Sequence, residues 1–209
     1  MNPREQLAHE ALRLHERYHR ELIERFSVCP WAKPARADGR TRAHVITDAT
    51  CGLEELMPVL REWAADEAVD VGFVIAPLFA GVADALADWA MSIGAQLGGV
   101  FLTAPFYPNA SDSAGSIHFL RQTPDPTIQL VRRTRLEEIR SQDPPHYTDI
   151  FELDLRRLEA EEPPRTVAAS VLAHNERMIA REGRTEIQAI LDDIREDRER
   201  TYSRLLPLL

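Results

Sequence analysis

The residues best suited to chemistry stand in the pentapeptide His15-Glu16-Arg17-Tyr18-His19. It matches the H-E-x-x-H pattern of zinc peptidases, in which two imidazoles one helical turn apart hold the metal and the glutamate is the general base. Such a site needs a third ligand and a substrate cleft. No downstream spacing nominates the ligand, and no sheet precedes the motif. We therefore favour the alternative, two histidines at the boundary of the core, and keep the metal site at His15, Glu16 and His19 as an open hypothesis.

A second candidate is the thiol of Cys29 in the stretch Cys29-Pro30-Trp31-Ala32-Lys33. A neighbouring cation can activate a cysteine as a nucleophile, because it stabilises the thiolate. The simpler interpretation is a small buried thiol beside a packing tryptophan, and we prefer it. Thiol-dependent catalysis through Cys29 remains the alternative.

Three arginines, Arg132, Arg133 and Arg135, form a small basic cluster. They could hold a carboxylate or a phosphate, but a solvated charged face is the more common explanation. The sequence has no glycine-rich phosphate loop, no paired-cysteine motif and no Ser-His-Asp order. We expect no cofactor.

The overall charge narrows the classes of partner. The formal net charge is −9, so a nucleic-acid partner is not expected without a local basic patch. The two cysteines are too few for a disulfide framework. The N-terminus lacks the apolar segment of a signal peptide, and no apolar run reaches transmembrane length. We expect a cytoplasmic protein with no membrane partner.

The segment from Val69 to Arg132 carries the strongest folding signal. The unbroken apolar run at 71–76 is typical of a strand that is covered on both faces. Large apolar residues at 82, 86, 89, 93 and 97 recur at helical spacing, and a second apolar run follows at 100–102. Strand, helix and strand in this order predict a crossover unit.

The remaining elements surround this unit. We predict helices at 4–26, 53–65, 135–140, 166–181 and 185–205, strands at 43–47, 116–120, 127–131 and 151–155, and loops at 30–40 and 105–115. Pro58 should delay or bend its helix, and Gly183 should separate the last two. The expected fold is one α+β domain over residues 1–209. A mixed β-sheet containing a βαβ unit (43–155) carries an N-terminal helix (4–26) and a C-terminal helical hairpin (165–205).

Four stretches occur in a familiar order: Cys29-Pro30-Trp31-Ala32-Lys33, residues 45–50, Phe106-Tyr107-Pro108 and residues 124–132. This order resembles an uncharacterised bacterial family (domain of unknown function 1415), whose motifs read C-P-F-A-K, F-H-P and P-Y-P-x-L-H-L-L-R. The resemblance covers roughly half of the chain. In this comparison the chain keeps six residues of the family motifs: Cys29, Pro30, Ala32, Lys33, Pro108 and Arg132.

Two positions depart from the family motifs. Where those motifs carry histidine, this chain has Tyr107 and Gln129. A cysteine with two histidines would suit metal binding or proton transfer near neutral pH, and neither tyrosine nor glutamine replaces that capacity. If the family site is catalytic, the resemblance implies that it is disabled here. If it only binds, both residues are good recognition groups, so the resemblance favours a binding protein over an enzyme.

We therefore expect a non-catalytic accessory protein that binds a peptide or another protein, for example by presenting a precursor peptide to modifying enzymes in a bacterial biosynthetic pathway. An extended peptide can pair with a free sheet edge. The strand from Thr127 to Arg132 is the predicted edge, because Pro124 and Pro126 precede it. The alternative is an enzyme that uses the histidine motif as a zinc-dependent hydrolase or the thiol as a catalyst.

The ligand is expected beside the loop at 105–115. Ligands gather at the carboxyl ends of strands in crossover sheets, and this loop follows such an end. Aromatic side chains would provide apolar area with polar tips, and arginines would hold an acidic group or a C-terminal carboxylate. The predicted ligand-binding residues are Trp31, Tyr107, His118, Arg121, Gln129 and Arg132.

The last predicted helix has an apolar stripe formed by Ile187, Ile190, Leu191 and Ile194. A stripe of this kind packs either within the chain or against a second copy. A homodimer is therefore one candidate assembly.

Overall fold

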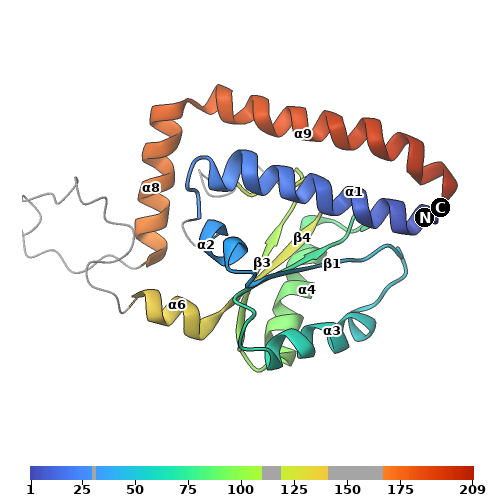
Figure 1. Cartoon of the computed structure of the whole chain (residues 1–209), viewed down its shortest axis with the longest axis horizontal. Coiled ribbons are helices and arrows are strands. Elements are labelled where there is room, and N and C mark those ends of the chain that lie inside the picture. The colour runs from blue at the N-terminus through green and yellow to red at the C-terminus, as the bar shows by residue number, and fades with distance from the viewer. Residues whose placement is uncertain (30–31, 110–118, 141–166) are drawn as a thin grey trace, which may run out of the picture.

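The computed structural model describes residues 1–29, 32–109, 119–140 and 167–209, and its sheet lies between two sets of helices (Figure 1). The strands are β1 (Thr41–Val45), β2 (Val71–Ile75), β3 (Phe101–Phe106) and β4 (Thr127–Arg132). The helices are α1 (Pro3–Tyr18), α2 (Ala32–Ala37), α3 (Leu53–Ala65), α4 (Ala83–Gln96), α6 (Arg133–Arg140), α8 (Val167–Glu182) and α9 (Arg184–Leu205). A π-helical turn, η1 (His19–Glu24), continues α1, and a 3-10 turn, η4 (Leu206–Leu208), follows α9. These elements confirm the predicted α+β class.

The four strands form one mixed sheet in the order β1-β2-β4-β3. β1 pairs with β2 in parallel, and β4 pairs antiparallel with both β2 and β3. α3 connects β1 to β2, and α4 connects β2 to β3, so the predicted strand–helix–strand unit is present with β4 inserted between its two strands. The prediction that residues 127–132 form an edge strand is wrong. Pro124 and Pro126 precede the strand, so their missing N–H groups leave its hydrogen-bond ladder intact.

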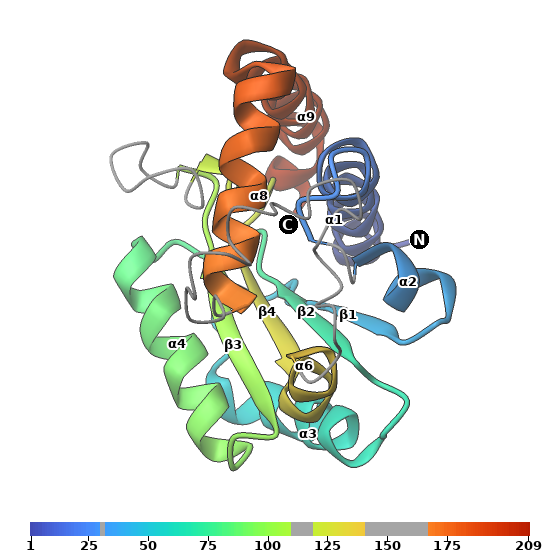
Figure 2. The same cartoon turned by 90° about the vertical axis from the view of Figure 1, so that its left-hand side faces the viewer.

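Alternation along the strands divides the residues of β4 between two faces. Ile128 and Leu130 belong to the core beneath α3 and α4, whereas Gln129 and Val131 face α1. Gln129 lies directly between Phe73 of β2 and Ala104 of β3 in the register. Figure 2 shows α3 and α4 on one side of the sheet and α1, α8 and α9 on the other.

The face covered by α3 and α4 is close-packed. A Cβ atom on Gly72 would come within 2.7 Å of the Trp63 ring, so only glycine allows this helix to approach β2 so closely. Arg132 closes the same layer: its guanidinium donates to the main-chain oxygens of Trp63, Asp66 and Val69. These carbonyls lie at and just beyond the C-terminal end of α3, where an α-helix leaves its acceptors unsatisfied.

On the opposite face, α1 crosses the sheet and α9 runs antiparallel to α1 (Figure 1). Arg13 and Arg17 of α1 both donate to Asp197 of α9 at 2.7 Å, and Arg17 also pairs with Asp193 at 2.6 Å. The Arg13 guanidinium, followed by that of Arg17, holds the pKa of the Asp197 carboxyl far below its usual range. Gly183, with φ of 89°, separates α8 from α9 as predicted, but the two helices meet at a corner (Figure 1), and α9 lies along α1 rather than along α8.

The sequence-based boundaries differ from the structure in a few places. Residues 32–37 of the predicted loop form α2, and α3 begins at Leu53 with Pro58 inside it rather than starting late. Of the strand predicted at 116–120, only Phe119 and Leu120 are described, and they are not in a strand. The strand predicted at 151–155 lies outside the described residues. In the described part of the chain, no helix combines the length and hydropathy needed to cross a membrane.

Asp125 anchors α9 to the start of β4. Its carboxylate is 1% exposed and accepts hydrogen bonds from Arg198 Nε at 2.7 Å and from the Tyr202 hydroxyl at 2.8 Å. The hydroxyls of Thr123 and Thr127 both donate to its main-chain oxygen. Four side chains therefore converge on this one buried residue.

Replacing Asp125 with alanine should lower the free energy of unfolding by about 3–5 kcal/mol, because the Arg198 guanidinium would lose its buried partner. Urea unfolding followed by circular dichroism measures the change. Asp192→Ala is the matched control. That carboxylate is half exposed, its partners Gln188 and Arg195 lie on its own helix, and the loss should stay below about 1 kcal/mol. Equal losses in the two variants would contradict the anchoring role.

Candidate functional site

A cavity lies between α1 and the sheet and consists of two adjoining chambers of about 210 Å³ each. Six residues contribute to the lining of both chambers: His15, His19, Cys29, Ala32, Phe73 and Gln129. The outer chamber extends toward Leu12, Arg36 and Thr41, and the inner chamber toward Phe106, Arg121 and Asn175. Leu12 and Arg36 are exposed, so the outer chamber reaches the protein surface.

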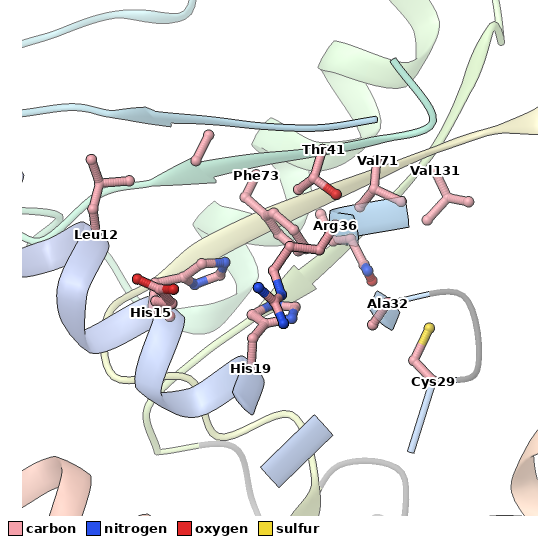
Figure 3. Close-up of a pocket in the computed structure, with 13 residues that line it drawn as sticks. Leu12, His15, His19, Cys29, Ala32, Arg36, Thr41, Val71, Phe73 and Val131 are labelled. Atoms are coloured by element: carbon pink, nitrogen blue, oxygen red, sulfur yellow. The ribbon is translucent and has the colours of Figure 1, made fainter. Parts of the chain in front are cut away.

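His15 and His19 enter the cavity from α1 because they share the helix face that packs on the sheet. Residues four apart on a helix are neighbours, and their ring centroids lie 4.5 Å apart. Both rings meet Phe73 edge-on, at 4.6 Å from His15 and 4.7 Å from His19. Figure 3 shows the two imidazoles pointing from the helix toward this ring.

The polar atoms of His15 are buried without hydrogen bonds. The residue is 7% exposed, and neither ring nitrogen has a partner among the described residues. A neutral imidazole offers one donor and one acceptor, and leaving both unmade in a buried site costs free energy. A ligand that reached His15 could satisfy both nitrogens.

Both imidazoles are held in the neutral form. Burial lowers the pKa of His15 well below its ordinary value of 6.5, and the nearby His19 lowers it further. Burial also lowers the pKa of His19 to about 4, a shift that Glu24 opposes and Arg36 supports. Near neutral pH the site therefore presents two uncharged hydrogen-bonding rings.

The glutamate of the zinc-type motif lines only the outer chamber. Glu16 is exposed there and pairs with Arg20 at 2.6 Å. Within the described ranges, no group of three His, Cys, Asp or Glu side chains is placed to hold a metal ion. The two imidazoles lie together as the motif requires, but the geometry provides no third protein ligand from these ranges.

Cys29 reaches the cavity through the turn that follows η1. Ser27 adopts a positive φ of 52°, and the Val28 N–H donates to the Ile23 carbonyl, so the chain turns back beneath the helix. Cys29 forms no disulfide with Cys51. Cys29 lines the cavity together with His15, His19 and Gln129, and a thiol and an imidazole are the residue types of a nucleophilic site. Figure 3 shows Cys29 and the two histidines around this cavity.

Arg121 brings a positive charge to the inner chamber. Its guanidinium carbon lies 5.2 Å from the centroid of the Phe106 ring, and burial lowers the pKa of this arginine. No carboxylate among the described residues forms an ion pair with it. Asn175 of α8 lies across the same chamber, is 2% exposed, and its Oδ1 atom has no partner in the described ranges.

The structure separates the predicted ligand-binding residues. Gln129 and Arg121 line the cavity, together with Cys29 from the thiol alternative and all three residues of the zinc alternative, Glu16 in the outer chamber only. Tyr107 instead packs in the α3/α4 layer and donates its hydroxyl to the Gly81 carbonyl at 2.9 Å. Arg132 lies in that layer as well. Trp31 and His118 lie outside the described residues.

The basic cluster at the end of β4 is a set of structural contacts. Arg132 binds the carbonyls at the end of α3, Arg133 donates to the Gly99 carbonyl, and Arg135 lies near Asp70. Each guanidinium is engaged by the protein itself. The contacts oppose an anion site, and the buried Arg132 does not fit the predicted solvated face either.

Sequence reasoning did not nominate Phe73 or Asn175 as site residues. Phe73 is part of an apolar run in which every member looks like core, so nothing in the sequence distinguishes it. Asn175 lies in the middle of a helical segment without a motif. By contrast, the histidines carried a signal in their spacing, which places both on the apolar face of the first helix.

No family model matches this chain, and neither the curated proteins nor the solved structures contain a significant match. The resemblance carried by Cys29, Phe106-Tyr107-Pro108 and residues 124–132 therefore stays a prediction. Two of its positions, Cys29 and Gln129, do line one cavity, whereas Tyr107 does not.

The buried histidines should make the fold sensitive to mild acid. Between pH 7.5 and pH 5.5 they bind protons in the unfolded chain, at a pKa of about 6.5, but not in the folded protein, where the pKa of His19 is about 4. The unfolded state then binds more protons than the folded state. The free energy of unfolding should therefore decrease by about 1.4 kcal/mol per histidine as the pH is lowered from 7.5 to 5.5.

The measurement is urea unfolding at the two pH values for the wild type and for the double variant His15→Leu/His19→Leu. The carboxylates are the same in both proteins. The difference between the two pH-dependent changes in the free energy of unfolding therefore reports the contribution of the histidines. A pH-dependent loss of the same size in both would show that the imidazoles are protonated in the folded protein.

Proposed function

We propose that this protein is a non-catalytic binding protein that receives an apolar group of its ligand in the cavity between α1 and the sheet. The observation that carries this proposal is His15, a buried side chain that lines the cavity with both ring nitrogens unpartnered among the described residues. Ligand sites are mostly apolar concavities with a few polar groups that fix orientation. A ligand at this position would restore the hydrogen bonds that folding leaves unmade.

The sheet topology changes how a peptide partner could bind. β4 has a paired neighbour on each side, so an extended peptide cannot add to it. A peptide partner, including the precursor peptide of a biosynthetic pathway, would instead insert a side chain or a chain end into the cavity. This mode supplies specificity through one buried anchor.

Ala32 provides a direct test, because it lines both chambers from α2. The neutral fluorescent probe N-phenyl-1-naphthylamine should bind the wild type with a dissociation constant on the order of 100 µM or tighter. Ala32→Leu fills the space shared by the chambers and should weaken binding at least about 10-fold.

Ala37→Leu, on the same helix but exposed, is the matched control and should leave the titration unchanged. Both variants should keep the far-UV circular dichroism spectrum of the wild type. If the probe fails to bind, or binds the Ala32 variant as tightly as the wild type, the cavity is not the binding site.

Thiol-dependent catalysis at Cys29 is the second candidate, because Cys29, His15, His19 and Gln129 line one cavity. The electrostatics oppose it. An ordinary thiol has a pKa of about 8.5, and transfer of its proton to an imidazole whose pKa is about 4 would cost about 6 kcal/mol. The buried histidines are therefore poor bases for this thiol.

His19→Leu should consequently leave the rate of Cys29 alkylation by iodoacetamide unchanged within about two-fold. Mass spectrometry of the peptide that contains Cys29 follows the reaction at pH 7, with Cys51 as the internal reference for general accessibility. A 10-fold or larger loss of rate, confined to Cys29, would show that His19 activates the thiol and would favour the enzyme.

A further inference from the structure

The described lining of the inner chamber carries one formal charge. Arg121 is the only charged side chain among its lining residues in the described part of the chain. The protein as a whole has a formal net charge of −9. A lone cation at a cavity inside an acidic protein marks a site selective for an anion, because it offsets the repulsion that the rest of the molecule imposes.

The guanidinium of Arg121 is available to a ligand. Its carbon atom lies over the Phe106 ring, and among the described residues no carboxylate forms an ion pair with it. Arg36, which lines the outer chamber, differs in this respect: Glu24 engages it with two hydrogen bonds of 2.6 and 2.8 Å. In the part of the chain that the structure describes, the inner chamber thus carries one positive charge without a paired carboxylate.

Some of the other polar groups of the inner chamber form hydrogen bonds within the protein, and others have no partner among the described residues. The Tyr18 hydroxyl donates to the Leu120 carbonyl, and those of Thr123 and Thr127 donate to the main-chain oxygen of Asp125. His15 and the Oδ1 atom of Asn175 are at least nine-tenths buried and have no partner among the described residues. The N–H group of the neutral His15 ring can donate to an anion, whereas the Asn175 Oδ1 atom is an acceptor and requires a donor on the ligand.

We infer that the inner chamber binds the carboxylate of an apolar acid, with Arg121 as its cationic partner and the apolar body of the ligand against Phe73. This inference rests on the proposed binding function and specifies the ligand class. A carboxylate is favoured over a phosphate, because one guanidinium matches a single negative charge and a phosphate carries up to two near neutral pH. The buried imidazoles are neutral and would add hydrogen bonds without adding charge.

Two sources provide this chemistry: a free organic acid and the C-terminus of a peptide that ends in an apolar residue. Both place a carboxylate next to an apolar group. The cavity has the volume for one such group, and the exposed side chains around the outer chamber leave room for a preceding chain. The experiment therefore includes one ligand of each kind.

The test is displacement of N-phenyl-1-naphthylamine from the full chain by matched pairs of competitors. The small-molecule pair is 4-phenylbutyrate and 4-phenylbutanamide, and the peptide pair is acetyl-Gly-Gly-Phe with a free or an amidated C-terminus. At least one acid should compete about 10-fold or more better than its amide. Arg121→Gln should remove that preference, and Arg121→Lys should retain part of it.

Arg133→Gln is the control for net charge, because Arg133 is exposed and lies on α6, away from the cavity. It should leave the preference for acids unchanged. The dissociation constant of the neutral probe itself should be the same in all three variants, which also shows that they are folded.

The outcomes separate the two proposals. If the probe binds but each acid and its amide compete equally, or if Arg121→Gln leaves the preference intact, the carboxylate inference is wrong and the apolar binding function stands. If the probe does not bind the wild type, both proposals fail. A preference confined to 4-phenylbutyrate assigns a free organic acid, and one confined to the peptide assigns a peptide C-terminus.

Discussion

The packing of α1 across the sheet is the interaction on which the layer of α1, α8 and α9 depends. One face of the helix buries Leu7, Leu14 and Tyr18 against α8 and α9, and His15 turns toward Phe73 of the sheet. Ion pairs of Arg13 and Arg17 with α9 hold the helix from the solvent side. Contact with the sheet is incomplete around the histidines, and the cavity occupies the space that remains. The same packing therefore creates both the stability of this layer and the site.

The cavity combines neutral hydrogen-bonding groups with a charged group. His15 and His19 contribute hydrogen bonding without charge, because burial keeps them neutral. Arg121 contributes charge to the inner chamber, and its guanidinium carbon lies over the Phe106 ring. Neutral recognition groups close to a single cation can discriminate between ligands by charge and by shape together. The enclosing residues are mostly apolar, which strengthens both kinds of interaction.

The sequence predicts the central elements well because burial on both faces leaves an unambiguous signal. β2, with all five residues buried, appears as an unbroken apolar run, and α4 appears as a stripe with helical spacing. The position of β4 in the sheet was not predictable from Pro124 and Pro126. Prolines ahead of a strand constrain its start and carry no information about its neighbours.

The site was predictable in part. Gln129 and Arg132 lie three positions apart, and residues separated by an odd number on a strand point to opposite faces, so the two could not share a ligand. Strand alternation thus distinguishes them from sequence alone. The contribution of Asn175 could not be predicted, because it depends on how α8 returns across the sheet from a distant part of the chain.

The π-helical turn has a consequence for insertions and deletions. His19–Glu24 winds more loosely than the α-helix before it, so η1 amounts to one surplus residue at the end of α1. Each residue of an α-helix turns the chain by about 100°. Loss of one residue after His19 within η1 would restore regular winding and reorient the turn that delivers Cys29, leaving the histidines in place. Loss of one residue near the start of α1 would instead rotate the first turns and leave the cavity untouched. Length changes along this single helix are therefore not equivalent, and natural variation in its length should be confined to the end remote from His15.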